Sequence, residues 1–165
     1  MNYHKISKFD TANGSGIGSV LWVSGCNHQC KECHNPQTWD ENSGQPFTEE
    51  TLKELLESLS NPHVKRFTLS GGDPLFPSNR LDCQRIAEQV KLRYPDKKIW
   101  LYTGYSWDDI KDLRIMEYID ILVDGEFKIE LKDISLPFCG SQNQRIIDVP
   151  QTLESGKIVL WENHN

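Results

Sequence analysis

The sequence predicts an α/β protein built on an open, parallel sheet or part of a (β/α) barrel. Short β-branched apolar segments alternate along the chain with amphipathic segments of helical period. Parallel neighbours cannot be joined by a two-residue hairpin, so strands separated by helices indicate parallel pairing with right-handed crossovers. The composition, 37% hydrophobic and 25% charged, is that of a folded protein, and 165 residues suffice for one core. We therefore expect one globular unit over residues 1–165, with about four to five βα units.

The first strand and the first helix are read from their apolar patterns. A β-branched run, Ile17–Ser24, predicts a buried strand that leads directly to Cys26. Thr48 is a candidate N-cap for a helix that begins with two glutamates. Asn61-Pro62 ends this helix, because the residue before a proline disfavours helical backbone. Its expected inward residues recur at i, i+3, i+4 and i+7: Leu52, Leu55, Leu56 and Leu59.

Further strands and helices alternate up to residue 125, and the chain from Glu126 onward shows no clear pattern. The expected strands are Lys65–Leu69, Lys98–Tyr102 and Ile119–Val123. The expected helices are Leu81–Tyr94, with Leu81, Ile86, Ala87 and Val90 facing inward, and Ser106–Met116. The glycine-rich segment Asn13–Gly18 precedes a strand, so it is expected to be a flexible loop rather than a phosphate-binding turn.

Unusual residues follow each expected strand. They are the cysteine segment after the first strand, then Gly71-Gly72-Asp73-Pro74, Thr103-Gly104 and Asp124-Gly125. In parallel α/β folds, ligands bind at the carboxyl ends of the strands. The sequence therefore predicts one ligand site at this edge of the sheet.

Charge and hydropathy limit the partners. Lys and Arg number 18 and Asp and Glu 24, a net charge of −6 without a basic cluster, so nucleic acid is not an expected partner. The N-terminal segment has no apolar signal core, and no apolar run approaches the length of a membrane span. We expect a cytoplasmic protein without membrane contact, in which clustered cysteines indicate metal or redox chemistry.

The segment CNHQCKEC holds Cys26, Cys30 and Cys33, while the other two cysteines lie far away in the sequence. A structural zinc site needs four ligands, and only His28 or His34 could complete a local set. The segment also contains the C-x-x-C-H pattern of c-type haem attachment and a possible C-x-x-C redox dithiol, but both leave Cys26 unused. An iron–sulfur cubane suits three thiolates best, because one iron then stays open to a ligand that is not protein.

Five sequence blocks follow one another along the chain: SGCNHQCKECHNPQTW (Ser24–Trp39), LSGGDPL (Leu69–Leu75), LYTGY (Leu101–Tyr105), LVDGEF (Leu122–Phe127) and GSQNQRIID (Gly140–Asp148). Together they resemble the radical S-adenosylmethionine (SAM) superfamily and, within it, the activating enzymes of anaerobic (class III) ribonucleotide reductase. Glu32 stands where many of these relatives carry an aromatic residue.

The resemblance implies a single radical SAM domain over residues 1–165, folded as a partial, open (β/α) barrel. It implies a [4Fe-4S] cluster on Cys26, Cys30 and Cys33, with SAM chelated to the open iron. The implied activity is that of an oxidoreductase that makes a 5′-deoxyadenosyl radical and installs a glycyl radical on the large subunit of the reductase. Flavodoxin or ferredoxin is the implied electron donor. The implied cofactor-binding residues are Glu32, Cys33, His34, Gly71, Gly72, Asp73, Pro74, Thr103 and Asp124.

Two other functions stay open at this stage. One is an activase of another glycyl-radical enzyme, such as pyruvate formate-lyase, and the other is a non-enzymatic iron–sulfur or zinc module that senses redox state or binds a partner. About four or five βα units would cover the ligand edge poorly, which favours a macromolecular substrate. We expect the partner to contact the loops near Tyr105, Gly125–Lys128 and Gly140–Gln144. Cys83 is expected to be a buried core residue.

Overall fold

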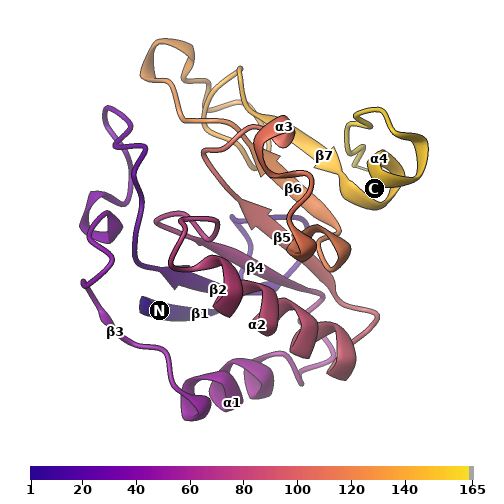
Figure 1. Ribbon diagram of the computed structural model, residues 1–165. Helices are drawn as coiled ribbons and strands as arrows, with labels where there is room; N and C mark the ends of the chain where they lie inside the picture. The colour runs from indigo at the N-terminus through magenta and orange to yellow at the C-terminus, as the bar shows by residue number, and fades with distance from the viewer. Residues whose placement is uncertain (164–165) are drawn as a thin grey trace.

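A seven-stranded sheet runs through the protein in the order β3-β1-β2-β4-β5-β6-β7 (Figure 1). The computed structural model describes residues 1–163. Strands β2, β4, β5 and β6 are parallel to one another, whereas β1, β3 and β7 are antiparallel to their neighbours. The strands are β1 (Asn2–Asp10), β2 (Gly18–Val23), β3 (Gln45–Pro46), β4 (Arg66–Gly71), β5 (Lys98–Tyr102), β6 (Ile121–Asp124) and β7 (Arg145–Asp148).

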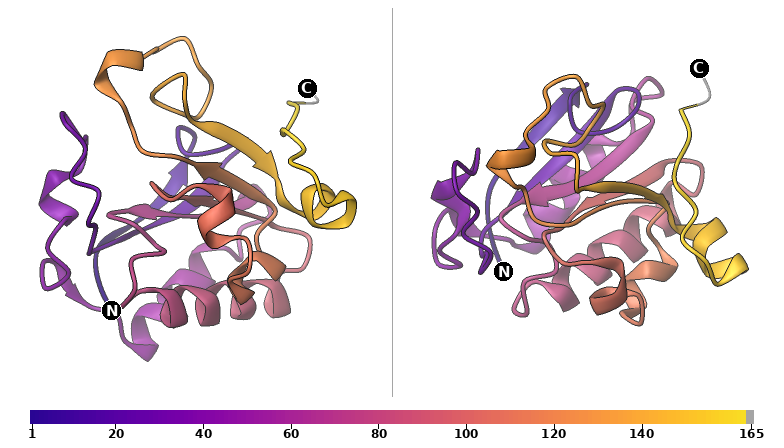
Figure 2. Two further views of the ribbon diagram at one scale, coloured as in Figure 1. Left: turned by 45° about the horizontal axis from the view of Figure 1, so that its top comes forward. Right: turned by 90° about the horizontal axis from the view of Figure 1, so that it is seen from above.

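Helices connect the parallel strands and lie on one face of the sheet (Figure 2). No helix within residues 1–163 is long and apolar enough to cross a lipid bilayer. The α-helices are α1 (Glu49–Ser58), α2 (Arg80–Arg93), α3 (Trp107–Ile110) and α4 (Val149–Ser155), and the 3-10 helices are η1 (Pro36–Thr38), η2 (Arg114–Glu117) and η3 (Ile129–Leu131).

The mixed α/β architecture with an open sheet is as predicted, and β5 has the predicted bounds. Thr48 caps α1 as expected, because its side chain accepts a hydrogen bond from the Thr51 N–H. Two expectations were wrong. Leu81 does not face inward but is 80% exposed, since the buried stripe of α2 begins at Cys83. The helix expected over Ser106–Met116 ends at Ile110, and extended backbone at Leu113 separates it from η2.

The two faces of the central strands carry different residues, because successive side chains point to opposite faces. The face toward the helices is apolar and includes Leu21, Phe67, Leu69, Ile99 and Leu101, all buried in the main core. The opposite face carries polar and aromatic residues: Trp22, Arg66, Thr68, Ser70, Trp100 and Tyr102. One face therefore builds the core and the other lines the interior of the open sheet.

An ion pair lies on this second face. Arg66 is fully buried, and its guanidinium donates to Asp10 Oδ1 at 2.7 Å and to the Thr68 hydroxyl at 2.8 Å. Burial raises the pKa of Asp10, but hydrogen bonds from Arg66 and Asn13 lower it more, so the pKa lies below its usual value. The last residue of β1 thus neutralises a buried cation on β4.

The long loop between β6 and β7, residues 125–144, rises from the sheet edge (Figure 1). Phe138 in this β6–β7 loop packs edge-on against Trp100 and Trp161, with ring centroids 5.4 and 6.0 Å away. At its base, Gln144 accepts hydrogen bonds from the Gly140 and Ser141 N–H groups and donates to the Gly125 carbonyl. The loop is therefore anchored at both ends.

Candidate functional site

A cavity of about 490 Å³ opens at the carboxyl ends of the parallel strands. Its size falls within the range of small-molecule sites. The walls come from the cysteine segment after β2, from the residues that follow β4 and β5, and from the β6–β7 loop. The predicted convergence of unusual residues at this edge is thus present in the structure.

Cys26, Cys30 and Cys33 all line this cavity and are partly exposed. We call residues 24–39 the cysteine loop. Its two ends pair with each other, because the Gly25 N–H donates to the Thr38 carbonyl at 2.7 Å and the Cys26 N–H donates to the Trp39 carbonyl at 3.0 Å. None of the five cysteines, all of which are described, forms a disulfide.

Burial makes the thiols of Cys26 and Cys30 weaker acids than a free cysteine. Burial raises the pKa of Cys26 to about 11. Burial also raises the pKa of Cys30, and the negative charge of Glu126 raises it further. The Asn35 N–H donates to the Cys33 sulfur at 3.4 Å. A ligand that binds the thiolates must therefore supply positive charge, as iron does, and binding will release protons.

Within residues 1–163, no set of three His, Cys, Asp or Glu side chains converges closely enough to bind one metal ion. A cubane takes each thiolate on a different iron atom, so its ligands need not converge on one point. Three unpaired thiols on one cavity, with a main-chain N–H directed at a sulfur, fit such a cluster.

Gly71 and Gly72 join the cysteine loop to β4. Main-chain hydrogen bonds continue past the strands, from the Gly72 N–H to the Val23 carbonyl at 2.8 Å and from the Asp73 N–H to the Gly25 carbonyl at 2.7 Å. A Cβ on Gly71, whose φ is +108°, would lie 2.5 Å from the Val23 nitrogen, and one on Gly72 would lie 2.5 Å from the Gly25 oxygen. These glycines therefore admit the neighbouring backbone, in addition to lining the cavity.

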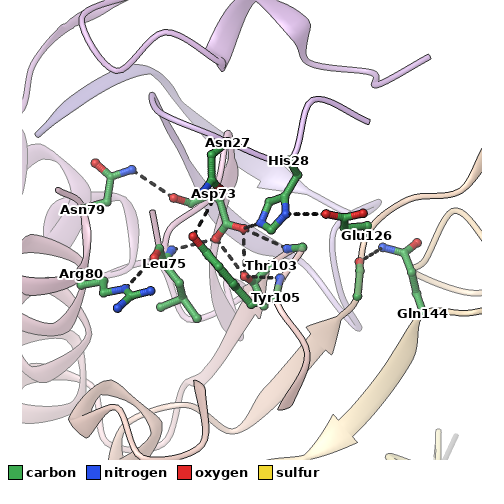
Figure 3. A network of polar contacts seen from close by, with 12 residues as sticks. Asn27, His28, Asp73, Leu75, Asn79, Arg80, Thr103, Tyr105, Glu126 and Gln144 are labelled. Carbon is green, nitrogen blue, oxygen red and sulfur yellow. Dashed lines mark hydrogen bonds and ion pairs between the residues drawn. The ribbon is translucent and has the colours of Figure 1, made fainter. Parts of the chain in front are cut away.

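Asp73 is the most connected side chain of the site (Figure 3). It is 1% exposed and accepts hydrogen bonds from the Leu75 N–H at 2.8 Å, the Gly104 N–H at 2.9 Å and the Thr103 hydroxyl at 2.9 Å. A buried carboxylate is tolerated when donors surround it in this way. Asp73 and Thr103, both predicted to bind cofactor, thus contact each other at the cavity wall.

His28 supplies a further contact to Asp73, which the sequence did not predict. Its Nε2 lies 2.8 Å from Asp73 Oδ2, and its Nδ1 lies 2.9 Å from Glu126 Oε1 (Figure 3). The hydrogen bond to Asp73 raises the pKa of His28, and Glu126 adds to the rise. The available signal was a histidine between two cysteines, a pattern that by itself indicates only a possible zinc ligand.

Residues 12–147 match the family model described as "4Fe-4S single cluster domain". An anaerobic ribonucleoside-triphosphate reductase-activating protein of Enterobacteria phage T4 is 44% identical over 146 residues, 88% of this chain and 93% of the relative. The chain belongs to this family. Activating proteins of the same name from Escherichia coli K12 and Vibrio cholerae are 42% and 43% identical, over 87% and 88% of this chain and 96% and 97% of theirs.

Membership of the activating-protein family confirms the resemblance found in the sequence. The single 4Fe-4S domain agrees with the iron–sulfur interpretation of the cysteine segment, in place of the zinc, haem and dithiol alternatives. The matched range includes the cysteine loop, the ends of β4, β5 and β6, and the β6–β7 loop. The family domain thus contains all the segments that form the walls of the cavity.

Some of the predicted cofactor-binding residues of this chain line the cavity and others do not. Glu32 is exposed and Pro74 is buried, and neither lines the cavity. The predicted residues that do line it are Cys26, Cys30, Cys33, His34, Gly71, Gly72, Asp73 and Thr103.

Asp124 lies on the helix side of the sheet rather than on the cavity. Its carboxylate accepts hydrogen bonds from the Trp107 N–H at 2.8 Å and from Arg145. Leu122, two residues earlier, faces the main core, and side chains two apart share a face. The alternation along β6 therefore explains why Asp124 points away from the cavity.

Several cavity residues were not predicted. Tyr102 ends β5, and its buried hydroxyl has no hydrogen-bond partner within the described chain. The tail from Glu126 had no readable pattern, yet it supplies a whole wall. The unpredicted lining residues include Ala12, Asn13, Tyr102, Phe127, Leu136, Phe138 and Cys139.

Proposed function

We propose that this chain is a radical SAM enzyme that activates an anaerobic ribonucleotide reductase by installing a glycyl radical on its large subunit. The observation that carries the proposal is that three thiols and the Gly71-Gly72 end of β4 line one cavity. The names of the relatives support the reductase as partner, and the matching domain supports a [4Fe-4S] cluster. These names also favour the reductase over other glycyl-radical enzymes.

In this proposal Cys26, Cys30 and Cys33 would hold the cluster as thiolates, and its open iron would take the amino and carboxylate groups of SAM. A bound cluster would supply the electron for cleavage of SAM to methionine and a 5′-deoxyadenosyl radical, which would take a hydrogen atom from the target glycine. The protein provides binding, orientation and shielding for this chemistry. A flavodoxin or ferredoxin is the proposed electron donor.

Other parts of the chain have supporting roles at the cavity. His34 lines the cavity, and its ring packs against that of Phe127 with centroids 5.7 Å apart, so the two rings form one surface on which a nucleoside can lie. Phe127, Leu136 and Phe138 place apolar surface on the wall formed by the β6–β7 loop. Such a wall keeps water away from a reactive intermediate.

Anaerobic reconstitution tests the proposal. The reconstituted chain should hold about four iron and four sulfide ions and should release 5′-deoxyadenosine from SAM when reduced. A chain that binds SAM or iron but yields no 5′-deoxyadenosine under strong reduction would contradict the radical SAM assignment.

A further inference from the structure

His28 connects the cysteine loop to the ends of three strands. It lies between Cys26 and Cys30 in the sequence, and only 10% of its side chain is exposed. One ring nitrogen contacts Asp73 after β4, and the other contacts Glu126 after β6 (Figure 3). Since both nitrogens face carboxylate oxygens, the ring acts as a donor in two directions.

The end of β5 holds the ring from the side. Tyr105 packs edge-on against His28 with ring centroids 4.7 Å apart. A Cβ on Gly104 would lie 2.5 Å from the imidazole, so the chain after β5 approaches the ring too closely for any side chain. The ring cannot rotate without losing the contact to Asp73 or that to Glu126.

We propose that His28 is a positioning residue that sets the spacing of Cys26 and Cys30 for the cluster and, through Glu126, joins the cysteine loop to the β6–β7 loop. The inference rests on the proposed function in taking the three cysteines as cluster ligands, and its consequence for docking also takes the reductase as the partner. Its role resembles that of the carboxylates and carbonyls that orient metal ligands from outside the first coordination shell.

The link to Glu126 has a consequence for the partner. Glu126 is the second residue of the β6–β7 loop, and its side chain is about half exposed, at 49%. A protein that docks on this loop would therefore displace a residue in direct contact with His28. Docking should be detectable at the cluster, without a new contact between the partner and the cysteines.

Two substitutions and two matched controls test this inference. His28→Gln removes the two-way donor, and Glu126→Gln weakens one contact on a residue whose side chain is about half exposed. His63→Gln and Glu130→Gln change the same residue types at exposed positions outside the contact. Circular dichroism of each variant reports folding separately from cluster binding.

The first measurement is the rate at which an iron chelator removes iron from each reconstituted protein. We expect His28→Gln to lose iron on the order of 10-fold faster than wild type, with a smaller effect of Glu126→Gln. The double variant should be no faster than His28→Gln alone, because the two residues act through one contact. The controls should match wild type.

The second measurement is the electron paramagnetic resonance (EPR) spectrum of the reduced cluster. Both test variants should change the g values of this spectrum at unchanged initial iron content. When a peptide with the glycine loop of the reductase is added, the spectrum of wild type should shift more than the spectrum of Glu126→Gln. Wild-type iron-loss rates and spectra in His28→Gln would overturn this inference alone. A wild-type chain that binds no cluster would overturn it together with the proposed function.

Discussion

Cys26, Cys30 and Cys33 reach one cavity from a loop whose two ends are paired by main-chain hydrogen bonds. Cys139 lines the same cavity but belongs to the β6–β7 loop. The cysteine loop therefore brings three thiols to the cavity together. The thiol of Cys139, on the opposite loop, allows a control substitution in the same cavity.

We predict that Cys26→Ser, Cys30→Ser and Cys33→Ser each lose most of the bound iron, because a missing thiolate exposes a second iron of the cubane. Iron and sulfide analysis after anaerobic reconstitution measures this loss. Cys139→Ser is the control and should retain the wild-type content. Full iron content in any of the three variants would remove that cysteine from the ligand set.

Gly72 lines the cavity and also packs against the cysteine loop. A side chain here would therefore meet the loop as well as the ligand. In the structure a Cβ at Gly72 would lie 2.5 Å from the Gly25 oxygen and 2.9 Å from the Thr38 oxygen, both in the cysteine loop.

Gly72→Ala should therefore displace the cysteine loop and lower the iron content as well as SAM binding. Iron analysis and a SAM titration on the same sample separate the two effects. Gly16→Ala controls for a general loss of stability, because its φ of +74° strains a side chain while its Cβ would meet only the Lys65 side chain, at 3.9 Å, and it should keep the wild-type iron content. Normal iron content with weakened SAM binding would contradict this prediction and show that the side chain affects only the ligand.

At the scale of single residues, motif spacing predicted the cysteines and glycines of the cavity because their chemistry is local. It did not predict His28, whose role depends on Asp73 and Glu126, residues 45 and 98 positions away. Asp124 shows the reverse problem, because a strand-end motif suggested a ligand where the alternation of β6 turns the side chain toward α3.

Among the elements, β1 has the least expected role. Its last residue, Asp10, supplies the counter-charge for Arg66, which is 1% exposed at the side chain. A second ion pair, between Lys8 on β1 and Glu54 on α1, contrasts with this buried pair, because both of its side chains are about half exposed.

We predict that Asp10→Asn lowers stability by about 3 kcal/mol, because a buried guanidinium then lacks its counter-charge. The melting temperature should fall by roughly 6–12 °C in a chain of this size. Glu54→Gln should cost less than about 1 kcal/mol. Equal melting temperatures for the two variants would show that the buried pair adds nothing.

The effect of Asp10 should also depend on pH. The pKa of Asp10 is lowered in the folded protein, so its stabilisation is complete above the pKa of an unfolded aspartate, about 4, and is lost as the pH falls through the lowered value. The difference in melting temperature between wild type and Asp10→Asn should shrink below about pH 4.

The parallel strands were predictable because each is short and mostly buried, with apolar residues on the face toward the helices. Strand β1 was not, since its sequence NYHKISKFD mixes polar and apolar residues and most of its side chains are only partly buried. The tail from Glu126 forms a long loop, an antiparallel strand and a short helix, and tertiary contacts such as those of Phe138 define these more than local pattern does.

For the whole molecule, the structure changes which residues of the proposed docking surface are free to bind a partner. Gly140, Ser141 and Gln144 form the internal base of the β6–β7 loop, so altering Gln144 would disturb the loop itself. Ile134 is 92% exposed on the same loop and is better suited to a test.

We predict that Ile134→Asp weakens reductase binding about 10-fold. If the reductase buries Ile134, a charged side chain there should cost more than about 1 kcal/mol of binding free energy. Leu81→Asp, on the exposed side of α2 and 80% exposed, is the control and should bind as wild type. Isothermal titration with the reductase measures both.

SAM should strengthen this docking in wild type, because SAM on the floor of the cavity gives the entering glycine loop contacts that the empty protein lacks. The coupling must be reciprocal. The same titration with and without SAM measures it. Identical affinities in the presence and absence of SAM would separate the docking surface from the cavity.

Formation of a glycyl radical on anaerobic ribonucleotide reductase tests the central claim most directly. The reductase is incubated with the reconstituted chain, SAM and a reductant, and its EPR spectrum is recorded. We predict a radical signal that requires all three components and is absent with Cys30→Ser. A signal that persists with Cys30→Ser, or no signal although 5′-deoxyadenosine is formed, would contradict the proposal that this chain activates the reductase.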